Sequence, residues 1–433
     1  MRTDGLRSAL VCITAIFIIT LSIGLQAIAA DSGTDKSSGG SESDREAVTL
    51  RAGLYTQEYP SVFNALRRPS YNQLNELFAV THVGLAAFCP DFTPEPCLAK
   101  SWDVASDGRS IKFHLVDNAT WHDGTPVRAE DVKFTYEYWR DNQLYRQGGW
   151  LNEYLDRVDV QDEFTGTVYL KQPYAYYFIK SLFPSVYIVP KHIWEKVDKP
   201  REYGEPDGMI GCGPFIFEKI DRDADTAYFR ANPDYFRGSP AIDRIEWKHY
   251  RTVDSTLLAL KKGDIDVIID ESPSGVLVPS LMNENGLTIE IGLNPGLPLL
   301  IFNYKKYPLN QTMFRRALSY AIDYQSLVDA IEAGYGEVPG SGILPSCIVE
   351  SNPDILKLEF NLTRSNEILD SLGFLDSNAD GIRNLPDGSE LQFKVIAWTD
   401  GKDMRVAEML SYMFKKVGID LQPYTNELSV LQK

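Results

Sequence analysis

The stretch from Leu98 to Trp139 constrains the fold of this 433-residue chain more than any other. It reads as a strand, a tight turn at Asp107-Gly108, and a second strand whose apolar residues alternate with period two. A second turn at Asp123-Gly124 precedes apolar residues at helical spacing. The apolar residues of the second strand are Ile111, Phe113 and Leu115, and those of the helix are Val132, Tyr136 and Trp139. The segment therefore predicts a β-hairpin followed by a helix.

The same stretch carries an ordered series of short motifs, which we call the first landmark. It begins LAKSW, continues with DGR and FHL, and closes with WHDGTPVRAEDV. This order resembles the opening segment of the family 5 extracellular solute-binding proteins, the peptide/nickel receptors of ABC importers. Arg128 stands where relatives usually place a Thr or Asn helix cap. Glu130 and Asp131 still put negative charge in the first turn, which favours the helix through its dipole.

Two further landmarks of that family follow in order. The second landmark is a G-x-G-P-[FY] turn with later A-N-P-x-Y-[WF] and L-x-x-G-x-I-D motifs, and Cys212 replaces the Thr that relatives usually have between the two glycines. Within it, Asp254 is expected to cap a helix that Gly263 ends. The third landmark, Leu299 to Gly336, is similar to the family's strand-Asn-loop-helix unit. The matching residues are Gly211, Gly213, Pro214, Phe215, Ala231 to Phe236 and Gly263 to Asp266, then Asn303, Arg315, Ala317, Leu318, Ala321, Ile322 and Asp323.

The resemblance implies an α/β fold, a two-lobed periplasmic-binding-protein-like (type II) clamp with an extra subdomain in the first lobe. On that template, lobe one comprises residues 46–81 and 205–293, the inserted subdomain residues 82–204, and lobe two residues 294–433. The length alone indicates more than one domain. Relatives usually continue well beyond the helix expected over Met404 to Val417. Lobe two is therefore expected to be incomplete, as in a truncated product, a fragment or an unusually short relative.

The N-terminal composition predicts export. Two arginines precede an uncharged apolar run from Ala9 to Ile28, and Ala27-Ile28-Ala29 supplies a small-x-small cleavage site. Residues 1–30 are thus expected to be a cleaved signal peptide or an uncleaved signal anchor, since the run is long enough to span a bilayer. The Ser/Gly/Asp-rich residues 31–45 contain no apolar side chain of any size to bury and predict either a flexible tether or a disordered N-terminus.

The overall charge limits the partners. A net charge of -17 and a pI near 4.8 argue against a surface for nucleic acid. Export makes the cysteines informative, because disulfides persist outside the cytoplasm. Cys89 and Cys97 flank a Pro-rich turn and are expected to close a short disulfide loop, whereas any pairing of Cys212 with Cys347 is a guess.

One segment matches the spacing of a calcium loop. Gly381 would sit at the sharp turn, and the oxygen ligands would be Asp376, Asn378, Asp380 and Asp387. Arg383 occupies a position where calcium loops usually hold an apolar residue, so a plain Asx-rich turn is the alternative. No cofactor other than calcium is indicated, and the five histidines show no metal-ligand spacing.

Ligand-binding candidates follow from the implied clamp, which closes on its ligand at the ends of strands. These candidates are Tyr55, Asn303, Trp398 and Asp400. An amide can hold a ligand's backbone through its two faces, and an indole offers a broad apolar surface with one N–H donor. For each residue, core packing or turn capping is the alternative role.

No catalytic motif is present, with neither GxSxG, HExxH, GxxxxGK[ST] nor GxGxxG in the chain, so an enzyme is not expected. The resemblance predicts a solute-binding receptor that captures peptides or a similar small solute outside the membrane and delivers it to an ABC permease and ATPase complex. Its expected location is the periplasm or the outer face of the cytoplasmic membrane, with membrane attachment if the N-terminal segment is not cleaved. The alternatives are a nickel-chelate or oligosaccharide receptor, a surface-anchored sensory module without transport, an exported hydrolase, and an incomplete fragment.

Overall fold

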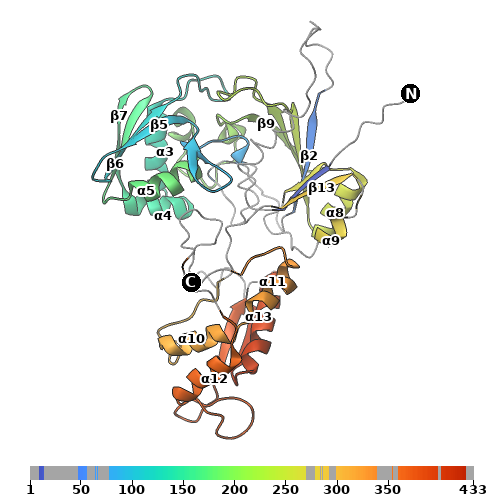
Figure 1. The fold of residues 1–433 in the computed structure, drawn as a ribbon. Helices are drawn as coiled ribbons and strands as arrows, with labels where there is room; N and C mark the ends of the chain where they lie inside the picture. Colours follow the sequence, from blue (N-terminus) through green and yellow to red (C-terminus); the bar gives the residue numbers. More distant parts are fainter. Residues whose placement is uncertain are drawn as a thin grey trace. The chain divides into compact units, whose positions relative to one another are not determined.

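The computed structural model describes residues 9–13, 47–55, 64, 66, 78–269, 278–282, 284, 286–291, 299–338, 354, 359–397 and 401–425 (Figure 1). The chain divides into two compact units. Unit 1 comprises residues 1–272 and 284–294, and unit 2 comprises residues 273–283 and 295–433. Each unit has a separate hydrophobic core.

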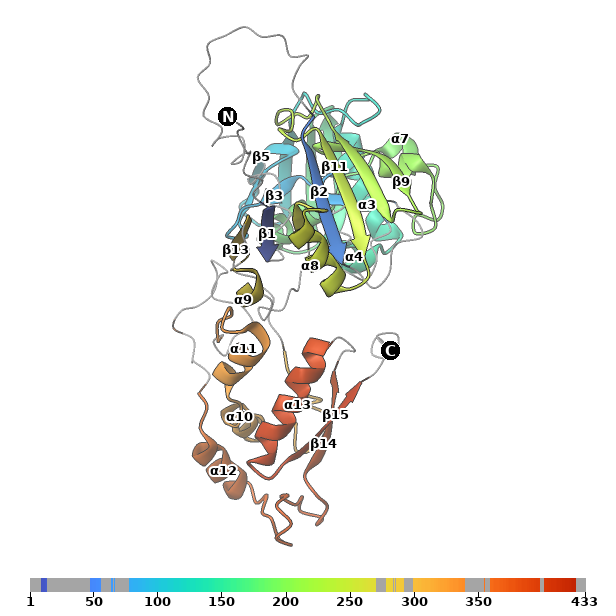
Figure 2. The same cartoon turned by 90° about the vertical axis from the view of Figure 1, so that its right-hand side faces the viewer.

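A seven-stranded sheet in the order β13-β1-β12-β2-β11-β10-β9 belongs to unit 1 (Figure 2). The strands from β13 to β11 in this order run parallel to their neighbours, and β10 and β9 add an antiparallel edge. The strands are β1 (Ala9–Ile13), β2 (Thr49–Tyr55), β9 (Phe215–Asp221), β10 (Thr226–Ala231), β11 (Arg244–Tyr250), β12 (Val267–Ile269) and β13 (Leu287–Ile291).

Helix α8 (Val253–Lys262) connects β11 to β12 and packs against β2. Its N-cap is Thr252, whose hydroxyl accepts the backbone N–H of Ser255 at 3.1 Å, so the prediction that Asp254 caps the helix was wrong. Asp254 lies in the first turn instead, where a carboxylate favours the helix dipole. Gly263 ends the helix at φ +73°, as predicted, because glycine reaches the left-handed region without a Cβ penalty.

Strand β1 lies within residues 1–30, for which the sequence predicts a signal peptide or a signal anchor. In the structure, Ala9–Ile13 pairs in parallel with both β12 and β13. A continuous apolar run suits a central parallel strand as well as a membrane-directed helix, so the signal segment stays a prediction. Among the residues that the structure describes, no helix is both long and apolar enough to cross a membrane.

The hairpin-and-helix prediction for the first landmark is confirmed. An antiparallel sheet of order β5-β6-β8-β7 carries it, with helix α3 following the hairpin. The elements are β5 (Ala99–Val104), β6 (Ser110–Leu115), α3 (Ala129–Asp141), α4 (Tyr145–Tyr154), β7 (Leu155–Asp162) and β8 (Thr165–Leu170). The shorter elements of this part of unit 1 are β3 (Ala86–Phe88), β4 (Pro94–Pro96), α5 (Ala175–Tyr177), the π-helix η3 (Phe178–Leu182), α6 (Phe183–Ser185), α7 (Lys191–Trp194) and the 3-10 helix η4 (Pro206–Met209).

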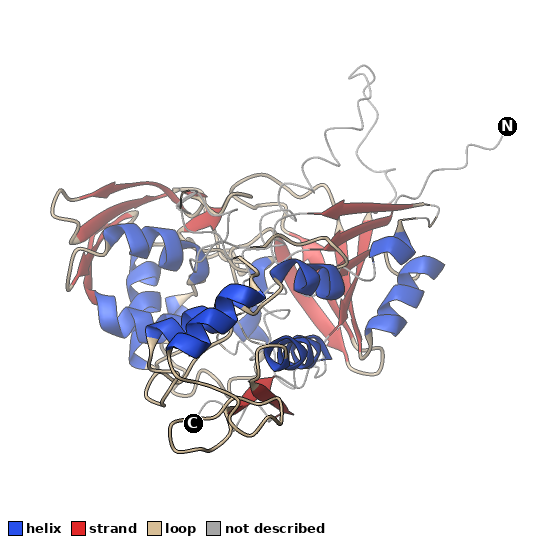
Figure 3. Cartoon of the chain, turned by 60° about the horizontal axis from the view of Figure 1, so that its bottom comes forward, coloured by secondary structure: helices blue, strands red, loops and turns tan. Residues whose placement is uncertain are grey.

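Unit 2 combines helices with a two-stranded parallel sheet; helices and strands are distinguished by colour in Figure 3. Its elements are α9 (Val278–Leu281), α10 (Thr312–Tyr320), α11 (Tyr324–Glu332), α12 (Leu362–Ser371), β14 (Gln392–Ala397), α13 (Gly401–Lys415) and β15 (Asp420–Thr425). Helix α13 covers most of the helix expected from Met404, and Gly418 follows it at φ +75°. Phe314, Phe374 and Phe414 lie at the centre of the core, each at most 2% exposed.

Candidate functional site

The carboxyl ends of the parallel strands define one edge of the unit 1 sheet. Strand β2 ends at Tyr55, and its register neighbour at the end of β11 is Tyr250. On the other side of β2, Ile269 ends β12 beside Leu54. The chain passes into unit 2 at residue 273, shortly after β12, and again at residue 295, shortly after β13. Open α/β sheets bind ligands at this carboxyl edge, so it is the candidate binding edge.

Tyr55 and Tyr250 are the polar groups that the structure places side by side at this edge. Both are partly buried, and each phenol can donate and accept a hydrogen bond. Burial, assisted by the negative charge of Asp264, raises the pKa of Tyr250, which keeps its hydroxyl protonated. Tyr250 was not predicted from the sequence, because no local motif marks it. Only the register of β11 with β2 places it beside Tyr55. A Cβ on Gly53 would lie 2.5 Å from the Ile265 side chain and 3.4 Å from the Tyr250 ring, so glycine allows close packing beside Tyr250.

Of the other three predicted ligand residues, Asn303 is the one that the structure describes. Asn303 belongs to unit 2, is exposed, and uses its side-chain oxygen to accept the N–H of Lys305 at 3.2 Å. This contact is the turn-capping role that was the alternative to ligand binding. Trp398 and Asp400 lie outside the described residues.

The first and second landmarks meet at a structural junction in unit 1. His122 lies against the glycine turn that opens the second landmark: its Nδ1 accepts the Gly211 N–H at 3.2 Å, and its Nε2 lies 3.1 Å from the Gly213 carbonyl oxygen. These two contacts require the neutral tautomer with the proton on Nε2. Burial, assisted by the positive charge of Arg230, lowers the pKa of His122 from 6.5 to about 4.

The glycines of this turn are required by close packing. A Cβ on Gly211 would lie 1.9 Å from the Thr81 carbonyl oxygen, and one on Gly213 would lie 2.6 Å from the Thr81 carbonyl carbon. The Gly213 N–H donates to that same Thr81 oxygen at 2.8 Å. Asn232 of the A-N-P motif is buried, and its amide donates to the Gly213 carbonyl at 3.1 Å. Gly211 and Gly213 therefore approach the Thr81 backbone too closely for a side chain at either position.

Asp131, in the first turn of helix α3, connects the start of this helix to residue Lys191. Its carboxylate is 6% exposed and accepts the backbone N–H groups of Arg128 and Lys191, each at 2.9 Å. Burial raises the pKa of Asp131 despite these hydrogen bonds. Arg128 itself directs its guanidinium to Glu163 at 2.5 Å, so it does not cap the helix with its side chain. His122, Asp131 and Asn232 of the first two landmarks thus hold backbone groups of the fold in place.

The predicted disulfide between Cys89 and Cys97 is absent, and both residues are free thiols. The register of the β3–β4 hairpin explains this. Cys89 pairs with Thr93 next to the turn, whereas the Cys97 N–H donates to Leu85, four residues before Cys89. Four residues of strand span about 13 Å, well beyond the Cα separation that a disulfide bridges.

The four oxygen ligands of the calcium hypothesis are engaged in separate turns. The Asp376 carboxylate accepts the N–H groups of Asp380 and Gly381, and Asn378 donates to Asp380 at 2.6 Å. Asp387 accepts both the N–H and the hydroxyl of Ser389 in a different turn, and the hydroxyl lowers the pKa of Asp387. These contacts match the Asx-rich turn that was the alternative. Among the described residues, no group of three or more His, Cys, Asp or Glu side chains is placed to hold a metal ion.

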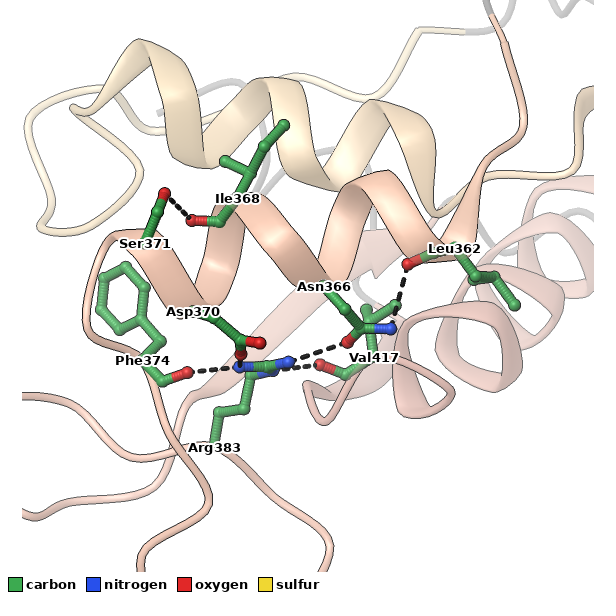
Figure 4. A network of polar contacts seen from close by, with 8 residues as sticks. All are labelled: Leu362, Asn366, Ile368, Asp370, Ser371, Phe374, Arg383 and Val417. Atoms are coloured by element: carbon green, nitrogen blue, oxygen red, sulfur yellow. Dashed lines mark hydrogen bonds and ion pairs between the residues drawn. The ribbon is translucent and has the colours of Figure 1, made fainter.

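Arg383, next to this turn, organises unit 2 (Figure 4). Its side chain is 11% exposed and donates to Asp370 at 2.5 Å, to Asn366 at 2.8 Å and to the Val417 carbonyl at 2.8 Å, with a further contact to the Phe374 carbonyl. Both carbonyls follow the last turns of α12 and α13, where a cation also favours the helix dipoles. From the sequence, Arg383 was notable only because it occupies a position where calcium loops usually hold an apolar residue.

This combination of a parallel sheet with an antiparallel edge, an antiparallel subdomain in the same unit and a second α/β unit defines the type II periplasmic-binding-protein fold. The family model of the "Bacterial extracellular solute-binding proteins, family 5 Middle" matches residues 93–430, and the chain belongs to this family. Members of the family are periplasmic or extracellular binding proteins.

Solved structures and curated proteins show the same relationship. The periplasmic oligopeptide-binding protein of an ABC transporter from Thermotoga maritima is 25% identical, with a TM-score of 0.74 over 88% of this chain and 73% of that one. NikZ from Campylobacter jejuni, solved with Ni(L-His), is 24% identical with a TM-score of 0.69 over 88% and 74%. The oligopeptide-binding protein AppA of Bacillus subtilis is 27% identical over 342 residues, which are 77% of this chain. Heme-binding protein A of Haemophilus influenzae is 26% identical over 366 residues, which are 78% of this chain. The match spans only 61% and 63% of the length of these two curated relatives.

Proposed function

We propose that this protein is the solute-capturing receptor of an ABC importer, binding peptides or a similar small solute outside the membrane and delivering it to a permease and ATPase complex. The observation that carries the proposal is the match to the solute-binding family over residues 93–430. The proposed role is non-covalent capture, and no enzymatic step is part of it. Relatives described as binding oligopeptides, dipeptides, di- or tripeptides and heme supply the range of solutes to test.

Tyr55 and Tyr250 are the side chains proposed to contact the solute in unit 1. They are the last residues of two adjacent parallel strands, at the carboxyl edge of the sheet where open α/β folds bind their ligands. Two neighbouring phenols offer ring surface for an apolar group and hydroxyls for the amide groups of a peptide. Peptides are therefore the favoured class at this edge, and metal chelates, oligosaccharides and haem are the competing ones.

The test is a thermal-shift screen of the secreted chain against di-, tri- and oligopeptides, a nickel–histidine complex, manno-oligosaccharides and haem. A true ligand at 100 times its Kd stabilises the folded state by about 2.7 kcal/mol, and the shift grows with concentration. A concentration-dependent shift with peptides supports the proposal, and a shift only with another class corrects the solute. A chain that unfolds cooperatively but is stabilised by none of these solutes refutes the receptor role.

Variants test the binding edge. Tyr55→Phe and Tyr250→Phe each remove one hydroxyl and are expected to weaken binding about 2–10-fold, the effect of losing one hydrogen bond. Tyr412→Phe is the matched control, because Tyr412 is 66% exposed on α13 and lies beneath Lys416. Equal affinities for all three variants and the parent would place the solute elsewhere. Release of a cleaved or altered solute during the assay would indicate a hydrolase instead.

A further inference from the structure

Four aromatic side chains form a continuous row on the antiparallel subdomain of unit 1. The Tyr177 ring lies between those of Trp150 and Tyr154, with centroids 5.8 and 5.1 Å apart, and Tyr154 contacts Tyr174 at 4.5 Å. Neighbouring rings meet at interplanar angles of 81°, 67° and 59° along the row. Each of the four residues is only partly buried, so the row reaches the surface. We call Trp150, Tyr154, Tyr174 and Tyr177 the aromatic row.

Helices α4 and α5 carry the aromatic row (Figure 1). Trp150 and Tyr154 are four residues apart on α4 and therefore share a face of that helix. Tyr174 caps α5, and its carbonyl accepts the Phe178 N–H at 2.9 Å. Tyr177 directly precedes the π-helix η3, whose first residue, Phe178, is fully buried. Such π-helical turns are rare and often mark functional sites, so the place of the row at this turn is a second, independent indication.

Polar groups line the rim of the aromatic row. The Tyr174 hydroxyl donates to the Gln172 side-chain oxygen at 3.2 Å, and the amide nitrogen of Gln172 carries two further donors. Burial raises the pKa of Tyr154, and the neighbouring Glu153 carboxylate raises it further. Lys171 directs its ammonium to a backbone carbonyl of α4 at 2.5 Å. The rim therefore offers hydrogen-bond donors and acceptors, and its anion and cation balance each other.

These features favour a neutral ligand that is rich in hydroxyl groups. One face of a sugar ring presents C–H groups that pack on an aromatic ring, while its hydroxyls can bond to donors and acceptors at the rim. An organic cation would meet Lys171 beside the row and Lys180, which lies 6.0 Å from the centre of the nearby Tyr176 ring. The net charge of -17 opposes an anionic lipid surface. Four partly buried rings also offer less than the about 800 Å² that each partner of a stable protein interface buries.

We propose that the aromatic row binds a neutral oligosaccharide chain. Successive sugar units would pack on successive rings, and their hydroxyls would bond to Gln172 and the other groups at the rim. Binding is non-covalent. The row lies on elements different from those of the candidate binding edge, so the inference goes beyond the proposed function and does not depend on it.

Isothermal titration of the full chain tests the proposal. The probes are glucose, mannose and the neutral hexasaccharides cellohexaose, maltohexaose and mannohexaose. Because several rings contact a longer chain, at least one hexasaccharide is expected to bind at least tenfold more tightly than its monosaccharide. Binding of none of the hexasaccharides, or equal affinity for the monosaccharide, would overturn the proposal. So would binding to phosphatidylglycerol vesicles without binding to any hexasaccharide.

Variants locate the sugar on the row. Trp150→Ala and Tyr177→Ala each remove one ring and should weaken hexasaccharide binding about tenfold. Gln172→Ala changes an exposed residue, keeps the fold and should weaken binding about 2–10-fold. If the ring variants do not fold in circular dichroism melts, Gln172→Ala decides. Tyr412→Ala, on the exposed face of α13, is the matched control and should leave the affinity unchanged. Loss of binding in Tyr55→Phe but not in the row variants would assign the sugar to the candidate binding edge and overturn the proposal.

Discussion

The pH dependence of unit 1 should carry a contribution from His122. Its Nδ1 accepts the Gly211 N–H. A proton on Nδ1 would turn this nitrogen into a donor facing the Gly211 N–H, and the hydrogen bond would be lost. Burial lowers the pKa of His122 to about 4, below the 6.5 of an unfolded chain. Between these values the unfolded state binds a proton that the native state does not. The free energy of unfolding therefore falls as the pH falls from about 6.5 toward about 4, and it is fully retained above this range.

The two pKa values of His122 determine the size of the effect. A difference of about 2.5 units corresponds to roughly 3.4 kcal/mol when the titration is complete. Between pH 7.5 and pH 5, the linkage relation gives a loss of about 2 kcal/mol from this one residue. This is an upper figure, because the ring is only partly buried and retains some contact with solvent.

Urea unfolding at pH 7.5 and pH 5 measures the effect, with tryptophan fluorescence as the probe. Six of the seven tryptophans lie in unit 1 and only Trp398 in unit 2, so the signal reports mainly on the junction's own unit. His122→Gln keeps a polar side chain that does not titrate and should lose less stability between the two pH values than the parent by up to about 2 kcal/mol. His114→Gln is the control, because that ring lies 3.4 Å from an Asp103 carboxylate that is 78% exposed. Equal losses in the parent and in His122→Gln would refute the reasoning.

Three other substitutions test contacts that the structure singles out. Arg383→Ala should destabilise unit 2 by about 3 kcal/mol in chemical unfolding. Arg383→Lys should recover only part of this stability, because an ammonium cannot reproduce the several donors of the guanidinium. Full recovery by lysine would contradict the proposed hydrogen-bond network. Gly211→Ala should cost about 3 kcal/mol or prevent folding, since its Cβ would meet a backbone carbonyl, whereas Gly149→Ala in α4, which has open space, should be neutral or slightly stabilising by circular dichroism melts. Asp266→Asn should cost about 1–2 kcal/mol through its paired contacts of 2.6 and 3.0 Å with Arg51, and an unchanged urea midpoint would show that this pair contributes nothing.

Local structure followed from local sequence wherever the cause lies within a few residues. The Asp107-Gly108 turn, the alternation of β6 and the ending of α8 at Gly263 depend on backbone sterics and on side chains close by in the chain. Such effects can be predicted from a single sequence. The N-cap of α8 was misplaced by two residues because Thr252 and Asp254 are both good caps and only the path of the preceding strand selects between them.

The candidate site was predictable only in part. Tyr55 could be proposed because it ends an apolar strand, but its neighbour Tyr250 follows from a register between strands almost two hundred residues apart. The disulfide prediction failed for a related reason. Proximity of Cys89 and Cys97 in sequence says little about separation across a hairpin, which the pairing register decides.

The sequence by itself determined the family, the order of the landmarks and the local elements, because each depends on short spacings and on turn chemistry. Only the tertiary structure decided what the landmark residues do. His122 meets Gly211 across 89 residues, and Arg383 meets Val417 across 34. Which distant backbone group a buried polar side chain satisfies depends on how sheets and helices pack, so these contacts could be known only from the tertiary structure.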